Sequence, residues 1–143
     1  DLDLIISHSR YSPYYGGDYL QIIRNDAGTF VDITSTAIRQ DNSDIYAGFL
    51  QWSPALYVKD VSKDGKDDII FARQDGTLRI FINENGASFR NFNVSLPPSQ
   101  GSGKLIGFDD FDGDGNFEAV YWQYGGTTDR KDYFVNLYKL IFA

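Results

Sequence analysis

Residues 60–71 read DVSKDGKDDIIF, and residues 110–121 read DFDGDGNFEAVY. Both stretches follow the pattern D-x-[DS]-x-D-G-x-x-[DE], and an apolar, strand-like run comes directly after each. Alternate oxygen-bearing side chains on a tight loop suit a hard cation such as Ca²⁺, which takes about six to eight oxygen ligands. Gly65 and Gly115 stand where such a loop must turn sharply, and glycine turns without steric cost. Because the motif recurs fifty positions along the chain, it indicates a repeated unit with a cation loop in each copy.

We name residues 60–68 the first acidic loop and residues 110–118 the second acidic loop. In each loop, positions 1, 3, 5 and 9 are predicted to supply side-chain oxygens, and position 7 its backbone carbonyl. The predicted calcium-binding residues are Asp60, Ser62, Asp64, Lys66 and Asp68 in the first loop and Asp110, Asp112, Asp114, Asn116 and Glu118 in the second.

An alternative is an acidic turn held by side-chain hydrogen bonds without a metal. Charge favours the metal, because several carboxylates within a few ångströms of one another repel unless a cation compensates them. The role of the ion would be structural: it would order a turn and join strands. Sites of this kind in extracellular modules bind calcium at about 10⁻⁴–10⁻³ M.

The loops do not fit an EF-hand. An EF-hand needs a bidentate Glu at position 12, where this chain has Phe71 and Tyr121. The acid comes instead at position 9, and strand-like segments follow where helices are expected.

A second repeated element is a hairpin. Residues 19–30 and 77–89 each form a β-rich run that ends in N-x-x-G and is followed within three residues by Phe. The Asn and Gly are predicted to supply turn conformations with positive φ. Residues 133–140 are expected to be a third copy of this strand, and residues 104–108 another strand.

The strand that follows each acidic loop has a third copy near the start of the chain. Residues 3–6, Asp-Leu-Ile-Ile, match Asp68-Ile-Ile-Phe and Glu118-Ala-Val-Tyr. Asp3 is therefore expected to be the last acid of an earlier loop. No stretch has a sustained 3.6-residue apolar period, and short apolar runs bounded by Gly, Asn, Asp and Pro are typical of antiparallel all-β proteins. Repeats of this length point to propellers or solenoids.

Composition limits the function. The chain has 143 residues, 42% of them apolar, which is enough for one domain with a core. It has no Cys, which excludes disulfides and thiolate chemistry. A net charge of −7 with scattered basic residues argues against a nucleic-acid partner, and no apolar run is long enough to span a membrane. Since the chain lacks Met and begins with Asp1, we expect a piece of a longer protein, with any targeting segment upstream.

At these residues the chain resembles the FG-GAP/VCBS repeat family, the blades of integrin-alpha-like β-propellers. The family's acidic pattern is met by residues 58–70 and 108–120, and its following hairpin by residues 76–80. The resemblance implies an all-β fold of antiparallel four-stranded propeller blades, here about two or three: a partial repeat at about 1–45 and repeats at about 46–100 and 101–143. Ser62 departs from the usual Asp or Asn, so we expect the first loop to bind calcium less tightly.

Catalytic chemistry has little support. His8 is the only histidine, no G-x-S-x-G or phosphate-binding loop occurs, and the acids are accounted for by the cation loops. We therefore expect no enzyme activity. Tyr11, Tyr14, Tyr15 and Tyr19 are expected to pack over their own blade or to contact a sugar or protein partner. Core packing is expected for Trp52, Tyr57, Trp122 and Tyr124.

The resemblance implies a secreted or cell-surface calcium-binding module that binds a protein or carbohydrate on its loop face. The alternatives are a non-catalytic accessory module of a larger secreted hydrolase or lyase, and a purely structural spacer. Closed propellers typically need at least about four blades. The remaining blades are expected to come from the parent chain or from another chain, unless the repeats form an open stack.

Overall fold

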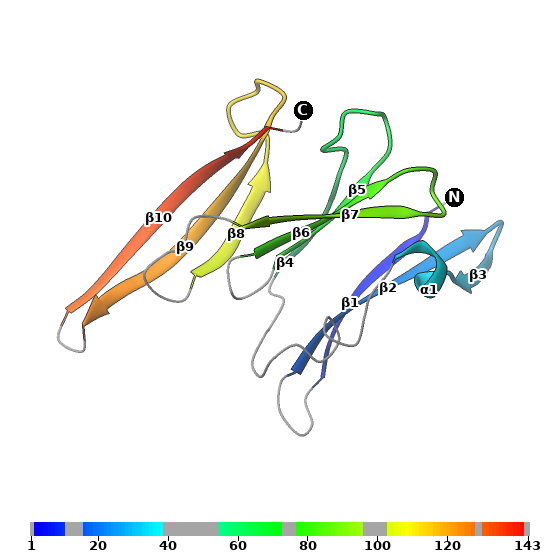
Figure 1. The fold of residues 1–143 in the computed structure, drawn as a ribbon, viewed down its shortest axis with the longest axis horizontal. Helices are drawn as coiled ribbons and strands as arrows, with labels where there is room; N and C mark the ends of the chain where they lie inside the picture. Colours follow the sequence, from blue (N-terminus) through cyan, green and yellow to red (C-terminus); the bar gives the residue numbers. More distant parts are fainter. Residues whose placement is uncertain are drawn as a thin grey trace.

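The computed structural model describes residues 2–10, 16–38, 55–72, 77–95, 103–127 and 130–141. The elements are β1 (Leu4–Arg10), β2 (Gly16–Asp26), β3 (Thr29–Asp32), α1 (Thr34–Ala37), β4 (Ala55–Lys59), β5 (Asp68–Ala72), β6 (Thr77–Asn83), β7 (Phe89–Ser95), β8 (Gly103–Asp109), β9 (Phe117–Thr127) and β10 (Arg130–Leu140). They form three antiparallel sheets, which lie side by side in Figure 1: sheet A (β1-β2-β3), sheet B (β4-β5-β6-β7) and sheet C (β8-β9-β10). The prediction of an all-β, antiparallel fold is confirmed. Within the described residues only sheet B has four strands, so four strands in every blade were not found.

Sheet B is the centre of the molecule because its two faces pack against different neighbours. In β5, three consecutive apolar residues, Ile69, Ile70 and Phe71, are all buried, although alternate side chains of a strand point to opposite faces. Ile69 and Phe71 lie in a core with sheet A residues such as Leu20. Ile70 lies in a second core with sheet C residues such as Tyr121. A strand covered on both faces reads as a continuous apolar run, which explains the sequence after the first acidic loop.

The strands of sheet C repeat those of sheet B in order and register. Ile70 pairs with Ile80 across β5 and β6, and Val120 pairs with Leu137 at the equivalent place across β9 and β10. By the same spacing β8, β9 and β10 correspond to β4, β5 and β6. The described part of sheet C therefore has no counterpart of β7, and that of sheet A has no counterpart of β4.

The hairpin turns of sheets A and B are built alike. Gly28 and Gly86 have φ of 96° and 78°, a left-handed conformation that favours glycine. Their backbone N–H groups donate to the side-chain oxygens of Asn25 and Asn83 at 2.7 and 2.6 Å. The prediction of positive φ is thus confirmed for glycine. It is wrong for these asparagines, which close the turns through their side chains instead.

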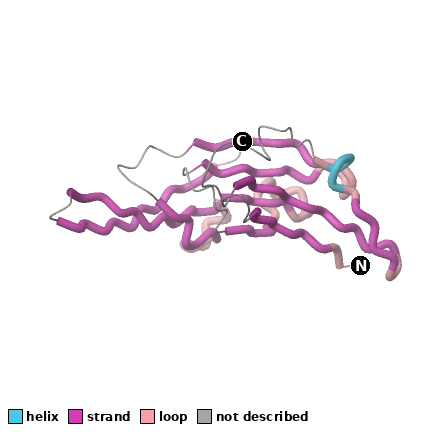
Figure 2. Tube along the Cα trace, turned by 90° about the horizontal axis from the view of Figure 1, so that it is seen from below, coloured by secondary structure: helices cyan, strands magenta, loops and turns pink. Residues whose placement is uncertain are grey.

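The helix α1 was not predicted from the sequence. Its start is fixed by Asp32, whose Oδ1 accepts hydrogen bonds from both the backbone N–H and the hydroxyl of Thr34. Ile33 and Ala37, four residues apart, are buried in the core between sheets A and B. Figure 2 shows how small this helical turn is beside the strands. The spacing of Ile33 and Ala37 was the available signal, but one turn is too short to give a periodic pattern.

The aromatic predictions have mixed outcomes. Tyr57 packs against the core between sheets B and C, with its ring 5.8 Å from that of Phe108, which confirms its packing role. Trp122 is half-buried in β9. Several predicted positions are outside the described residues or have side chains that are not described: Tyr11, Tyr14, Tyr15, Tyr19, Trp52 and Tyr124, together with His8.

A membrane-spanning segment of helical type is not found in the described residues, since none of them forms a helix of the necessary length and apolarity.

Replacing Ile80 by Ala is expected to lower the free energy of unfolding by about 3 kcal/mol, because the side chain is fully buried between sheets B and C. Leu137→Ala is the matched control, because Leu137 holds the equivalent place in β10 and is 62% exposed. Its cost is expected to stay below about 1 kcal/mol. Urea unfolding followed by tryptophan fluorescence measures both, and equal losses would contradict the stacking of the sheets.

Candidate metal sites in the two acidic loops

The two acidic loops occupy equivalent places and lie next to each other. The first joins β4 to β5 and the second joins β8 to β9. The Lys59 ammonium is 3.0 Å from both carboxylate oxygens of Asp109, and it lowers the pKa of that carboxyl group. The Lys63 ammonium donates to the side-chain oxygen of Asn116 at 3.2 Å. Basic groups of the first loop region thus reach the second loop.

Position 1 holds each turn together through its carboxylate. Asp60 accepts hydrogen bonds from the backbone N–H groups of Asp64 and Gly65 at 3.1 and 2.8 Å. Asp110 accepts from Gly113 and Gly115, both at 2.8 Å. Asp60 and Asp110 therefore order their loops even without an ion.

At positions 4 and 6 of each loop the backbone adopts the left-handed conformation that the turn requires. Gly65 and Gly115 at position 6 have φ of 85° and 83°, which confirms the sharp turn predicted there. Position 4 also lies in the left-handed region, with φ of 75° at Gly113 and 62° at Lys63. A lysine is strained in this conformation and a glycine is not. The need for a left-handed residue at position 4 was not predicted from the sequence.

Position 5 is bonded forward to position 7 in both loops. Asp64 accepts the backbone N–H of Lys66, and Asp114 accepts that of Asn116, each at 2.9 Å. The ammonium of Lys66 also binds Asp64 at 2.6 Å and lowers the pKa of this carboxyl group. The first loop therefore contains a positive charge, that of Lys66, which partly neutralises its carboxylates.

Asp68 at position 9 of the first loop is fully buried and fully hydrogen-bonded. Its Oδ2 accepts from the backbone N–H groups of Val61 and Ser62, at 3.1 and 3.0 Å. Its Oδ1 accepts from the backbone N–H of Asn83 in β6, at 2.7 Å. This carboxylate joins the loop, β5 and β6, so it has a structural task whether or not an ion binds.

Asp3 takes the corresponding place in sheet A. Its carboxylate accepts the backbone N–H of Asn25 at 2.9 Å, as Asp68 accepts that of Asn83. Asp3 therefore makes one of the position-9 contacts, in agreement with its prediction as the last acid of an earlier loop.

Glu118 at position 9 of the second loop is buried but only partly hydrogen-bonded. It is 1% exposed, and its Oε2 accepts the backbone N–H of Phe111 at 2.9 Å. Its Oε1 is buried and has no hydrogen-bond partner. A buried carboxylate oxygen without such a partner is costly unless a cation lies near it.

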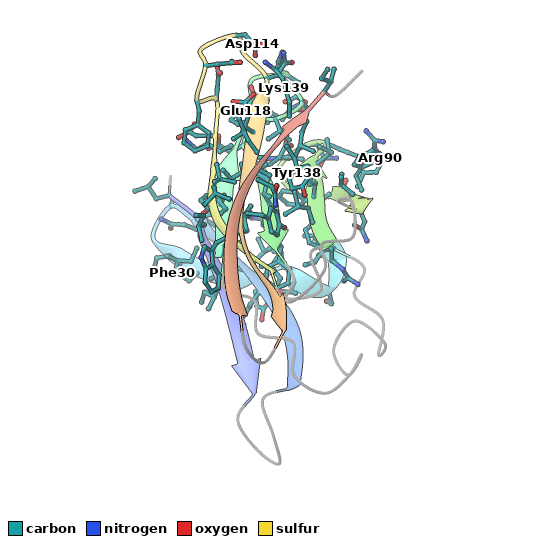
Figure 3. The ribbon with its side chains drawn as sticks, turned by 90° about the vertical axis from the view of Figure 1, so that its left-hand side faces the viewer. Phe30, Arg90, Asp114, Glu118, Tyr138 and Lys139 are labelled. Atoms are coloured by element: carbon teal, nitrogen blue, oxygen red, sulfur yellow. The ribbon has the colours of Figure 1, made fainter. Side chains whose placement is uncertain are left out.

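The second loop brings the carboxylate of Glu118 together with two others. One oxygen each of Asp110, Asp112 and Glu118 lies within 4.8 Å of the others, a spacing that suits one cation. The Lys139 ammonium from β10 lies at their edge, 2.8 Å from Asp112 and 3.6 Å from Glu118, and it also bonds Asp114. Figure 3 shows Asp114, Glu118 and Lys139 together at one end of the molecule. The contact with Lys139 is the first cause that lowers the pKa of Asp114 to about 2.

The first loop forms no such group within the described residues. Ser62 replaces one carboxylate, and its hydroxyl is 3.5 Å from Asp60. The remaining acids bind N–H groups or Lys66. The structure thus places all ten predicted residues in two similar loops but brings a cluster of three carboxylates together only in the second.

Lys139 was missed in the sequence. The signal was its place opposite Glu118 in the pairing of β10 with β9, and that register is not visible before the strands are paired.

The geometry agrees with the comparison to known families. The model of the family described as FG-GAP-like repeat matches residues 60–121, from the first acidic loop through the strand after the second. This segment is similar to the FG-GAP-like repeat family. The match confirms the resemblance seen in the sequence. No curated protein and no solved structure matches the chain.

Asp68→Ala is expected to lower the free energy of unfolding by about 3 kcal/mol, because three backbone N–H groups lose their buried acceptor. This loss should already be seen with chelator, because the three hydrogen bonds do not depend on an ion. Asp67→Ala removes the same charge from an exposed neighbour and is expected to change stability by less than about 0.5 kcal/mol. Chemical denaturation in the presence of EDTA measures the free energy of unfolding of both variants. A small effect of Asp68→Ala would refute the structural role of Asp68.

Gly113→Ala is expected to destabilise the chain by about 1 kcal/mol, because alanine is strained at this positive φ. Steric contact is not the cause, since a Cβ at this position would have nothing within 4 Å. Gly107→Ala is the comparison, since its backbone is not left-handed but its Cβ would meet the Phe111 ring at 3.2 Å. Thermal melting followed by circular dichroism measures the change, and an unaffected Gly113→Ala protein would contradict the argument.

Proposed function

We propose that this chain is a calcium-stabilised repeat module of β-propeller type, without enzyme activity, and that the second acidic loop is its stronger calcium site. The observation that supports this most is the buried Glu118 carboxylate. Its Oε1 has no hydrogen-bond partner, and one of its oxygens lies within 4.8 Å of oxygens of Asp110 and Asp112. Hard carboxylate oxygens are the ligands that calcium prefers.

The residues present suit the ion. Asp110, Asp112 and Glu118 would hold it through their carboxylates, and Asp114 and the backbone carbonyl of Asn116 complete the set predicted from the sequence. The ion would neutralise acids that otherwise repel one another, and it would fix the turn between β8 and β9. The first loop, with one carboxylate fewer and its own Lys66, would bind more weakly.

The outer face of sheet C supports a propeller-like continuation. Val135 and Leu137 are 66% and 62% exposed, whereas the equivalent Leu78 and Ile80 of β6 are fully buried against sheet C. Phe111 is 56% exposed, whereas its equivalent Val61 is buried in the same core. An apolar face of this kind, together with a sheet that has three strands in its described part, suits the packing of a further repeat.

We further propose an extracellular role in binding a protein or carbohydrate. This rests on the repeat family and on calcium sites suited to millimolar external calcium. The spacer alternative predicts no such binding by the isolated chain. A hydrolase or lyase domain in the parent chain would favour the accessory-module alternative. A glycan array and a screen against cell-surface extracts, both with and without calcium, test this role.

Glu118→Gln is expected to weaken calcium binding at the second loop at least about tenfold, because the variant loses the charge of a buried member of the three-carboxylate cluster. Asp67→Asn is the control, with the same loss of charge at an exposed position outside the predicted ligand set. Isothermal titration of chelator-stripped protein with Ca²⁺, and with Mg²⁺ for comparison, measures the affinities. Absence of calcium binding by the wild-type chain would refute the proposal.

A further inference from the structure

Lys139 approaches the second acidic loop from a different element. It lies in β10, directly opposite Glu118 in the pairing with β9. Its ammonium is 2.8 Å from Asp112 and 3.6 Å from Glu118, and it also bonds Asp114. The carboxylates of Asp112, Asp114 and Glu118 all lie against this ammonium and hold it close to the loop (Figure 3).

The ammonium contacts two of the three carboxylates that an ion would need. Asp112 and Glu118 are both members of the three-carboxylate cluster, and Lys139 lies 2.8 Å from Asp112 and 3.6 Å from the Oε1 of Glu118. An ammonium is a compact point charge. Two cations a few ångströms apart repel, so the lysine and a divalent ion do not share these carboxylates at low cost.

The equivalent place in sheet B carries no charge. Continuing the register of β5 and β6 by one pair places Ile82 where β10 has Lys139. Ile82 is buried in the core between sheets B and C. The packing of the strand therefore does not require a lysine at this position. The lysine occurs beside the second loop, which has three clustered carboxylates, and not beside the first. This difference indicates that Lys139 acts on the second loop.

We propose that Lys139 is a tethered cation that neutralises the metal-free second loop and competes with calcium for it. The inference rests on the proposed calcium site. It makes the loop stable when the ion is absent, and it lowers calcium affinity, since binding must displace the ammonium from Asp112 and Glu118.

Lys139→Met tests the competition, because it keeps the length of the side chain and removes the charge. Calcium affinity is expected to rise roughly five- to twentyfold, the effect of losing two or three ion contacts near the surface. In EDTA the variant is expected to melt at a lower temperature than the wild type, and at saturating calcium the deficit should vanish or reverse. A side chain that acted only in packing would lower stability in both conditions.

Lys59→Met is the matched control. It removes a lysine of similar exposure that pairs with Asp109, directly before the same loop, and has no contact with the three-carboxylate cluster. Its calcium affinity is expected to stay within about twofold of the wild type.

The outcomes separate the two claims. Equal affinities of the wild type and Lys139→Met would overturn the competition while the calcium site remains. An equal gain in Lys59→Met would also overturn it, because a general charge effect would then explain the result. Absence of binding by every protein would overturn the calcium site and the competition together.

Discussion

The loops depend on a buried carboxylate that accepts backbone N–H groups. Asp68 and Glu118 stand at the start of the second strand of their repeats, and each accepts the N–H of the loop residue at position 2. Asp68 also binds the neighbouring strand β6, and Asp3 makes the same contact in sheet A. Because these carboxylates join turn to sheet, the turn, the strand register and the direction of the inward side chains are fixed together.

The second constraint is charge. Each loop concentrates acids that must be compensated, and the two loops do so differently. The first loop satisfies its buried acid with three N–H groups and pairs Asp64 with Lys66. In the second loop one buried oxygen of Glu118 has no hydrogen bond, and the compensating positive charge comes from Lys139 in β10. The same motif therefore gives one loop that is largely complete by itself and one that is suited to an ion.

The fold class and the repeated unit could be predicted from the sequence because both depend on residues that are close together in the chain. The acidic loops, the strands that follow them and the glycine turns all depend on neighbours in the chain. The helix α1 was missed because it is held by contacts of Asp32 and Thr34 and by burial of Ile33 and Ala37 between two sheets. For the site, the loop residues could be named, but the difference between Asp68 and Glu118 could not. It depends on which N–H groups and cations from β6 and β10 reach each carboxylate, and this requires the strand pairing.

A crystal structure of the chain grown with saturating calcium tests whether the second loop holds an ion. The ion is expected at about 2.3–2.6 Å from carboxylate oxygens of Asp110, Asp112 and Glu118, with the Lys139 ammonium moved away from Asp112. An ordered second loop that contains no ion, with Lys139 still bound between Asp112 and Asp114, would contradict this expectation.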